Sequence, residues 1–536
     1  MSKQEFDYVV VGGGSAGCCV AGRLSEDLST SICLLEAGGP DDSVFVRAPL
    51  GFAATASLNM NSWGYHTVPQ AGFNGRKGFQ PRGKVMGGSS SVNAMVYTRG
   101  NARDYDAWSA LGNQGWSFQE ILPYFKRTEH NECFGANAYR GVGGPLNVSY
   151  LRSPSPINHA FVKACNEQGI PSNPDYNGEK QFGVSPGQVT QKGGERWNAA
   201  RAYVDPHRHQ SNLQVISHAH ATQIVFEGKR AVGVKYLVNG VHHEVHARKE
   251  VIVSGGAFGS PQLLMLSGVG PALHLQDLGI PLVHELPGVG QNLQDHITTV
   301  LIYKTSKIND AMGFSLKGTL NMIKAMFEWR SKRTGWITSN VSETQGFIST
   351  EGNPDHPNIQ LALCTSIVDD HARKIHMGHG YTLHVTLMRP KSRGTLTLAS
   401  KNPTDKPLID PAFFKHPDDL DNLVSATQKG LKIMASEGLA SYRCDMLYPV
   451  NPDRPEQIRT FLRDHSDTEY HPVGTCKMGP IHDPLAVVDA ELRVHGLQNL
   501  RVIDASIMPN LVTGNTNAPT LMIAEKGVDL IRGARL

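Results

Sequence analysis

The chain has 536 residues, of which 40% are hydrophobic and 18% are charged, with 55 glycines and 31 prolines. This length exceeds one hydrophobic core, so the composition predicts a globular, turn-rich α/β protein of at least two packed units without long disordered segments. Lysine and arginine exceed aspartate and glutamate by 51 − 48 = 3, and no basic block stands out, so nothing indicates a nucleic-acid partner.

Targeting signals and metal motifs are not evident in the sequence. The first residues carry neither the long apolar segment nor the small-residue cleavage site of a secretory signal, which predicts a cytoplasmic protein. The eight cysteines lack metal-binding spacing, so we expect buried reduced thiols and no metal. No apolar stretch reaches 18 residues, so no membrane span is predicted.

The N-terminal segment has the pattern of a dinucleotide site. Residues 6–11 predict a buried strand, 12–17 read G-x-G-x-x-G, 15–25 predict a helix, and a second apolar strand leads to Glu36, nineteen residues after Gly17. Gly12 permits the tight turn, Gly14 admits the pyrophosphate, and Gly17 allows close packing of helix and strand. The Glu36 carboxylate suits a ribose and disfavours the 2′-phosphate of NADP, which leaves FAD and NAD.

Three later segments add ligand-binding features. Residues 81–100, PRGKVMGGSSSVNAMVYTRG, combine glycines and serines in a loop that could lie flat against a heterocycle. Residues 255–270 follow an apolar strand, with Pro261 expected in the first turn of a helix. Near the C-terminus, 501–503 predict a strand and Pro519 is expected to open a helix, whose amino end would stabilise negative charge.

Two short patterns offer rival chemistries. GVSPG at 183–187 matches the G-x-S-x-G of hydrolases, but no apolar strand precedes Ser185. HHEVH at 242–246 is one residue short of the zinc motif and is interpreted as a polar strand face. We therefore expect neither a hydrolase nor a zinc site.

Two segments of the second half have clear periodicity. Residues 318–333 place Leu320, Ile323, Met326 and Phe327 on one helical stripe with basic residues elsewhere. Such a helix more commonly faces the core, although it could also rest on a bilayer surface. Residues 381–400 predict two strands joined by a polar turn.

His471 stands in DTEYHPVGTCKMG, residues 467–479, directly before a proline. Proline keeps the preceding residue out of the helical region, so the imidazole is expected on a stiffened turn. A single histidine among 23 is more often structural than chemical, and the local sequence alone does not assign it a role.

Taken together, these segments resemble the glucose-methanol-choline (GMC) family of FAD-dependent oxidoreductases over essentially the whole chain. Residues 82–100 and 256–270 resemble the two family signatures, and PGVGQNLQDH at 287–296 is similar to a further family segment. His471 and Asn515 match the catalytic His and Asn of the family, 44 residues apart. Within the family the chain looks most like bacterial alcohol dehydrogenases, with choline dehydrogenase next.

The resemblance implies FAD and a set of cofactor contacts. The residues implied are Gly12, Gly14, Ser15, Gly17, Glu36, Ala37, Arg82, Gly83, Met86, Gly87, Gly88, Asn93, Ala94, Met95, Val96, Ala221, Asp504, Ala505, Asn515, Thr516 and Asn517. Some relatives tether the flavin through a histidine in the Gly-Gly-Ser-Ser-type loop. Val92 occupies that position here and has no nucleophile, so non-covalent FAD is predicted.

The resemblance also implies the fold. It is α/β (α+β overall), with a Rossmann-type FAD-binding domain built from discontinuous segments and a substrate domain on an antiparallel sheet flanked by helices. Approximate boundaries assign 1–155, 210–306 and 475–536 to the FAD domain and 156–209 and 307–474 to the substrate domain.

The implied reaction is oxidation of a primary alcohol to the aldehyde, with His471 as base, Asn515 orienting the hydroxyl and hydride transfer to flavin N5. Electrons would pass to a quinone or another non-oxygen acceptor, and peripheral contact with the inner face of the cytoplasmic membrane stays open. Glu343, in a segment resembling a substrate-proximal stretch, could attract a cation such as choline, although a solvated or structurally hydrogen-bonded glutamate is an equal alternative. Alternatives are choline dehydrogenase, an oxygen-using alcohol oxidase, and a lyase or photodecarboxylase of the same fold.

Overall fold

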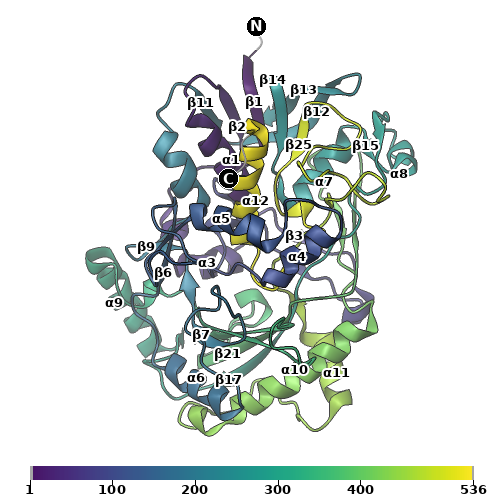
Figure 1. Ribbon diagram of the computed structural model, residues 1–536. Coiled ribbons are helices and arrows are strands. Elements are labelled where there is room, and N and C mark those ends of the chain that lie inside the picture. Colours follow the sequence, from purple (N-terminus) through teal and green to yellow (C-terminus); the bar gives the residue numbers. More distant parts are fainter. Residues whose placement is uncertain (1–3, 534–536) are drawn as a thin grey trace.

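The computed structural model describes residues 4–533, which form two sheets with their covering helices (Figure 1). In the first sheet, the five strands β11, β2, β1, β14 and β25 form parallel pairs, as expected for a nucleotide-binding unit. The strand order is β11 (Leu213–Ile216), β2 (Ile32–Leu35), β1 (Gln4–Val11), β14 (Val241–Val253), β13 (Arg230–Val238) and β12 (Ala219–Glu227), with β25 (Leu500–Val502) also pairing with β14.

Two helices far apart in sequence pack together against this sheet. α1 (Ser15–Ser25) and α12 (Asn517–Arg532) are neighbours, and the Arg23 guanidinium donates to the buried Glu525 carboxylate of α12 at 2.9 Å (Figure 1). β1 and α1 confirm the strand and the helix that were expected on either side of the glycine motif. α12 begins at Asn517, two residues before Pro519. Proline is accepted in the first turn of a helix, so Pro519 lies near the amino end as expected.

The second sheet is antiparallel throughout. Its order is β24 (Asp467–Thr468), β17 (Ile297–Lys304), β21 (Gly378–Leu387), β20 (Ile359–Cys364), β19 (Ser342–Ile348) and β7 (Gly183–Pro186), with β18 (Gly313–Phe314) beside β21. One apolar core joins it to α6 (Ile157–Glu167), α10 (Pro417–Ala435) and α11 (Pro455–His465), which lie along one side of it in Figure 1. This arrangement agrees with the expected fold class.

The remaining elements connect and flank the two sheets. The other helices are α2 (Val44–Arg47), α3 (Gly51–Ser57), α4 (Ala102–Ala110), α5 (Phe118–Thr128), α7 (Gly256–Leu266), α8 (Ala272–Asp277) and α9 (Leu316–Lys332). Small sheets contain β3 (Tyr65–His66), β4 (Phe79–Gln80), β5 (Glu129–Asn131), β6 (Leu146–Tyr150), β8 (Gln188–Val189), β9 (Gln191–Lys192), β10 (Glu195–Arg196), β15 (Val269–Gly270), β16 (His284–Glu285), β22 (Thr395–Thr397) and β23 (Leu408–Asp410).

Three local expectations differ from the structure. Pro261 lies inside α7, which begins at Gly256, and not in its first turn. Residues 381–400 do contain two strands, but β22 pairs with β23 and not with β21. The apolar stripe of α9 faces outward, so the core-facing interpretation of this helix is wrong.

The domain division stays a proposal, and core packing suggests two changes to it. β17, expected within the FAD domain, is a central strand of the second sheet and packs in the core with α10. Residues 199–204, expected in the substrate domain, pack in the core of the first sheet. Within residues 4–533 no helix has the length and hydropathy needed to cross a membrane.

Candidate active site

A cavity of about 410 Å³ is lined by residues of both sheets and their loops. Most of the predicted cofactor residues lie in its wall, and they come from chain segments that only the fold brings together. They are Gly12, Gly14, Ser15, Glu36, Ala37, Arg82, Gly83, Gly88, Asn93, Ala94, Met95, Val96, Ala221, Asp504, Ala505, Asn515, Thr516 and Asn517.

Three predicted cofactor residues, Gly17, Met86 and Gly87, do not line the cavity. A Cβ at Gly17 would lie 1.8 Å from the Gly12 oxygen, so this glycine serves the close packing of α1 on the loop. The Gly87 N–H donates to the Gly13 oxygen at 2.7 Å, and the buried Met86 lies next to Gly13. These residues support the glycine loop from behind.

Glu36 is a buried carboxylate at the end of β2. Its Oε2 accepts from the Gly13 N–H at 2.8 Å and its Oε1 from the Gly38 N–H at 2.7 Å. Burial raises the pKa of Glu36 to about 7, although both backbone donors oppose that change. Each oxygen keeps lone-pair capacity toward the cavity, which fits acceptance of two ribose hydroxyls.

Two helix amino ends meet at the cavity. α1 and α12 both begin without a side-chain cap, and their first residues Ser15 and Asn517 are joined by a hydrogen bond of 2.7 Å. Uncapped amino ends offer N–H donors and a partial positive charge. A Cβ at Gly14 would meet no atom within 4 Å, so the space before α1 is open for a ligand. These features fit the pyrophosphate and ring of FAD.

His471 is positioned by its backbone. Its N–H donates to Asp295 Oδ1 at 2.8 Å, and Asp295 is itself held by Gln80 and Thr468. The preceding Tyr470 has φ 69°, a conformation uncommon for a bulky residue that persists only where the surroundings impose it. The stiffened turn expected from Pro472 is thus reinforced by a buried carboxylate.

The hydrogen-bond chain through two histidines assigns the tautomer of His471. His296 Nε2 lies 3.0 Å from the Met388 carbonyl, which only accepts, so this nitrogen carries the proton. Neutral His296 therefore accepts through Nδ1, which lies 2.9 Å from His471 Nδ1. His471 must donate from Nδ1, and its Nε2 is left with a lone pair at the cavity wall.

Asn515 completes this arrangement. Its Oδ1 accepts from Gln360 Nε2 at 3.2 Å and from Thr98 Oγ1 at 3.4 Å, which fixes the amide so that Nδ2 donates to His471 Nε2 at 3.1 Å. The structure thus brings the two predicted catalytic side chains into direct contact at the cavity. Neither His296 nor Gln360 was predicted as a site residue, although His296 ends the family segment at 287–296.

Both imidazoles are neutral at physiological pH. Burial, His296 and Arg82 hold the pKa of His471 well below its usual value of 6.5. Burial also lowers the pKa of His296 to about 4. His471 is therefore available as a proton acceptor throughout the neutral range.

Another part of the cavity wall is largely apolar, and the charge of Glu469 in this part is balanced by His384. Its wall includes Phe52, Ala53, Ala56, Met60, Val341, Ala362, Ile367 and Val368. Glu469 Oε2 lies 3.3 Å from His384 Nδ1. Burial opposes the charge of both groups. His384 nevertheless lowers the pKa of Glu469, while Cys364 and Glu469 together raise the pKa of His384 well above its usual value. The pair adds no net charge to the cavity.

Glu343 does not line this cavity, so the geometry does not support the suggested contact with a cationic substrate, which stays a prediction. Its Oε2 accepts from the Ser155 N–H at 2.7 Å and from Asn158 Nδ2 at 2.6 Å, while Oε1 accepts from the Ser339 hydroxyl. The side chain is buried against a separate small cavity and joins β19 to the start of α6. These contacts are typical of a structural carboxylate.

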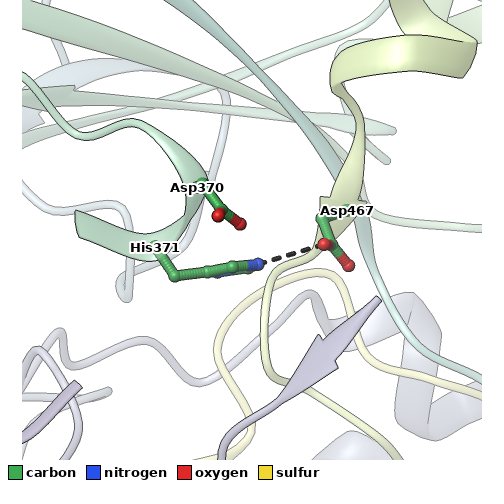
Figure 2. Close-up of side chains that lie close together, drawn as sticks. All are labelled: Asp370, His371 and Asp467. Carbon is green, nitrogen blue, oxygen red and sulfur yellow. Dashed lines mark ion pairs between the residues drawn. The ribbon is translucent and has the colours of Figure 1, made fainter. Parts of the chain in front are cut away.

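Asp370, His371 and Asp467 lie close together, as Figure 2 shows, and His371 also lines the cavity. His371 Nε2 lies 3.2 Å from Asp467 Oδ2, and Asp467 also pairs with Arg76 at 3.3 Å. Asp370 Oδ1 lies 2.6 Å from Arg373 Nη2. Both carboxylates already have guanidinium partners, so the cluster is better described as an ion-pair network than as a cation site.

The rival motifs lie elsewhere. Ser185 is buried in β7 and does not line the cavity that holds His471. Residues 242–246 form part of β14, as expected for a polar strand face.

Val92 does line the cavity, where its aliphatic side chain offers no atom for a covalent tether, so non-covalent FAD stays a prediction.

Comparisons with known proteins agree with this geometry. Models described as "GMC oxidoreductase" match residues 6–298 and 390–524. The chain is 45% identical to "Alcohol dehydrogenase [acceptor]" of Pseudomonas putida, covering 98% of this chain and 95% of that protein. It is 44% identical to "Choline dehydrogenase, mitochondrial" of Homo sapiens, covering 99% and 90%. Pyridoxine 4-oxidase from Mesorbium loti superposes with a TM-score of 0.89 at 31% identity, covering 99% of this chain and 100% of that one.

Proposed function

Because the chain belongs to the GMC family of FAD-dependent oxidoreductases acting on alcohols, we propose that it oxidises an uncharged primary alcohol to the aldehyde. The observation that carries this proposal is the contact between His471 Nε2 and Asn515 Nδ2 at the cavity wall, where a bound alcohol hydroxyl would replace the amide as the partner of the Nε2 lone pair. Bound FAD supplies the hydride acceptor for the reaction. The residues of the chain then have to bind, orient and deprotonate the alcohol.

His471 is the proposed base. The alcohol first replaces the hydrogen bond between Asn515 and His471; Nε2 then takes the hydroxyl proton, while Asn515 Nδ2, whose amide is held by Gln360, donates to the alcohol oxygen. When Nε2 becomes protonated, the Nδ1–H remains directed at His296, and that hydrogen bond strengthens as the ring gains charge. The orientation of both groups is set before substrate arrives, which should contribute much of the rate.

An uncharged alcohol is favoured over choline by the charges of the cavity. Among residues 4–533 its wall contains three carboxylates, Glu36, Glu469 and Asp504. Glu36 and Asp504 accept from backbone N–H groups near the glycine loop and α7, and Glu469 is paired with His384. None is left as an unpaired charge for a quaternary ammonium group, and the neighbouring wall is apolar.

We further propose a quinone or another electron carrier as the acceptor, in line with the name of the alcohol dehydrogenase relative. Oxygen is the second candidate, because some relatives are called oxygen-dependent choline dehydrogenases and a structural neighbour is called an oxidase.

Steady-state turnover tests substrate and acceptor together. We expect kcat/KM for 1-octanol to exceed that for choline by about tenfold or more, with a short polyethylene glycol as a third substrate. Reoxidation should be faster with ubiquinone than with air. Equal or better turnover of choline would favour the choline dehydrogenase alternative. If no alcohol bleached the flavin anaerobically, a lyase or photodecarboxylase activity would replace this proposal.

A further inference from the structure

The outer face of α9 is an apolar surface without a protein neighbour among the described residues. Leu316, Leu320, Ile323 and Phe327 are spaced by about one helical turn and are 90%, 67%, 47% and 72% exposed. They run about 16 Å along the helix. Globular proteins normally turn such a stripe toward their core, so its outward orientation needs an explanation.

The opposite face of α9 does pack on the protein. Gly318, Ala325 and Trp329 are its buried residues, and Trp329 lies in a small core with Leu50 and Trp336. Leu50 and Trp336 also pack in the next apolar cluster, which includes Val341 and Cys364 of the cavity wall. α9 is therefore held in a fixed orientation, and about one layer of side chains separates it from the active-site cavity.

Neighbouring segments extend the apolar surface. Phe314 of β18 is 56% exposed and Met377 is 73% exposed, and the two residues are bridged in register beside the start of α9. We call Phe314, Leu316, Leu320, Ile323, Phe327 and Met377 the outer stripe. Figure 1 shows α9 at the edge of the molecule, far from α8 on the other side.

Basic side chains accompany the outer stripe. Lys317, Lys324, Arg330 and Lys332 are exposed on α9. Glu328, the acidic residue of this helix, accepts from the Thr334 hydroxyl at 2.8 Å and points to the following turn. A helix with an outward apolar stripe and flanking cations is suited to lie in the interface of a bilayer that contains anionic lipids.

We propose that the outer stripe of α9 docks the protein on the surface of an anionic lipid bilayer. The helix lies in the plane of the interface, with its apolar side chains among the acyl chains and its cations at the lipid phosphates. A second copy of the chain is a poorer occupant, because a symmetric contact would bring both sets of basic residues together. Docking would hold the active-site cavity next to the phase in which long-chain alcohols and quinones dissolve.

Flotation of the full-length holoenzyme with lipid vesicles tests this proposal. We expect binding to vesicles that contain phosphatidylglycerol and much weaker binding to pure phosphatidylcholine, with increasing salt weakening the former. The double substitution Leu320→Glu with Phe327→Glu should lower the bound-to-free ratio by about tenfold or more. Leu273→Glu on α8 changes a leucine that is at least as exposed as Leu320 and should leave binding unchanged.

Two further measurements keep the outcomes distinct. Melting temperature and turnover with a soluble dye acceptor should be unaffected by the double substitution, which shows that fold and chemistry are intact. Wild-type protein that stays free of phosphatidylglycerol vesicles would overturn the proposal, as would a double variant that binds as well as wild type. A dimer in size-exclusion chromatography that the double variant abolishes would instead assign the stripe to a second copy.

Discussion

In the His471→Ala variant, the rate at which alcohol reduces the bound flavin should fall by about two to four decades, which is the usual contribution of general acid–base catalysis to a rate. The loss is expected because this substitution removes the lone pair that takes the hydroxyl proton and leaves Asn515 without its partner. Rapid mixing of the anaerobic enzyme with alcohol, followed at the flavin absorption band, measures the rate directly.

The control variant for this experiment is His296→Leu. It keeps the base and removes only the group that accepts the His471 Nδ1–H, so its loss should be smaller than that of His471→Ala. Both variants should keep FAD, and added imidazole should restore part of the rate to His471→Ala alone. Reduction of His471→Ala at a near-wild-type rate would remove this residue from the mechanism.

Gly14→Val should abolish FAD binding without unfolding the protein. Gly14 has φ −80°, an ordinary value for any residue, and a Cβ there meets no protein atom within 4 Å. The added side chain would instead fill the space in front of α1, where a pyrophosphate must approach the N–H groups. Flavin content of the purified protein should fall by about tenfold or more.

Circular dichroism and thermal melting separate this effect from misfolding, since Gly14→Val should retain the wild-type spectrum. Gly17→Ala provides the contrast, because its Cβ would clash with the Gly12 oxygen at 1.8 Å and should destabilise the fold itself. Wild-type FAD content in Gly14→Val would mean that the cofactor does not lie before α1.

The sequence predicts those features that depend on local pattern. The strand, glycine turn and helix at 4–25 follow from residue type and period, and Glu36 follows from its distance to the turn. The pairing of His471 with Asn515 was implied by family resemblance and not by spacing. Only the fold brings the turn after β24 to the amino end of α12.

Features that depend on tertiary contact could not be predicted from the sequence. Glu343 was expected near substrate, but Ser155 and Asn158, which hold it, lie more than 180 residues away in the chain. His296 was quoted within a motif, yet its effect on the His471 tautomer depends on the Met388 carbonyl. Periodicity identified the stripe of α9 correctly, but it cannot show which face of a helix has a partner.

The pH dependence of anaerobic flavin reduction tests the central claim most directly, namely that His471 is a neutral base with its lone pair directed at the substrate. Because burial, His296 and Arg82 lower the pKa of His471, its neutral form persists as the pH falls through the usual histidine range. The predicted rate is constant from about pH 8 to about pH 6.5, where a histidine with the usual pKa would already have lost half of its neutral form, and it declines only at lower pH. A rate that has fallen to half or less by about pH 6.5 would contradict the account.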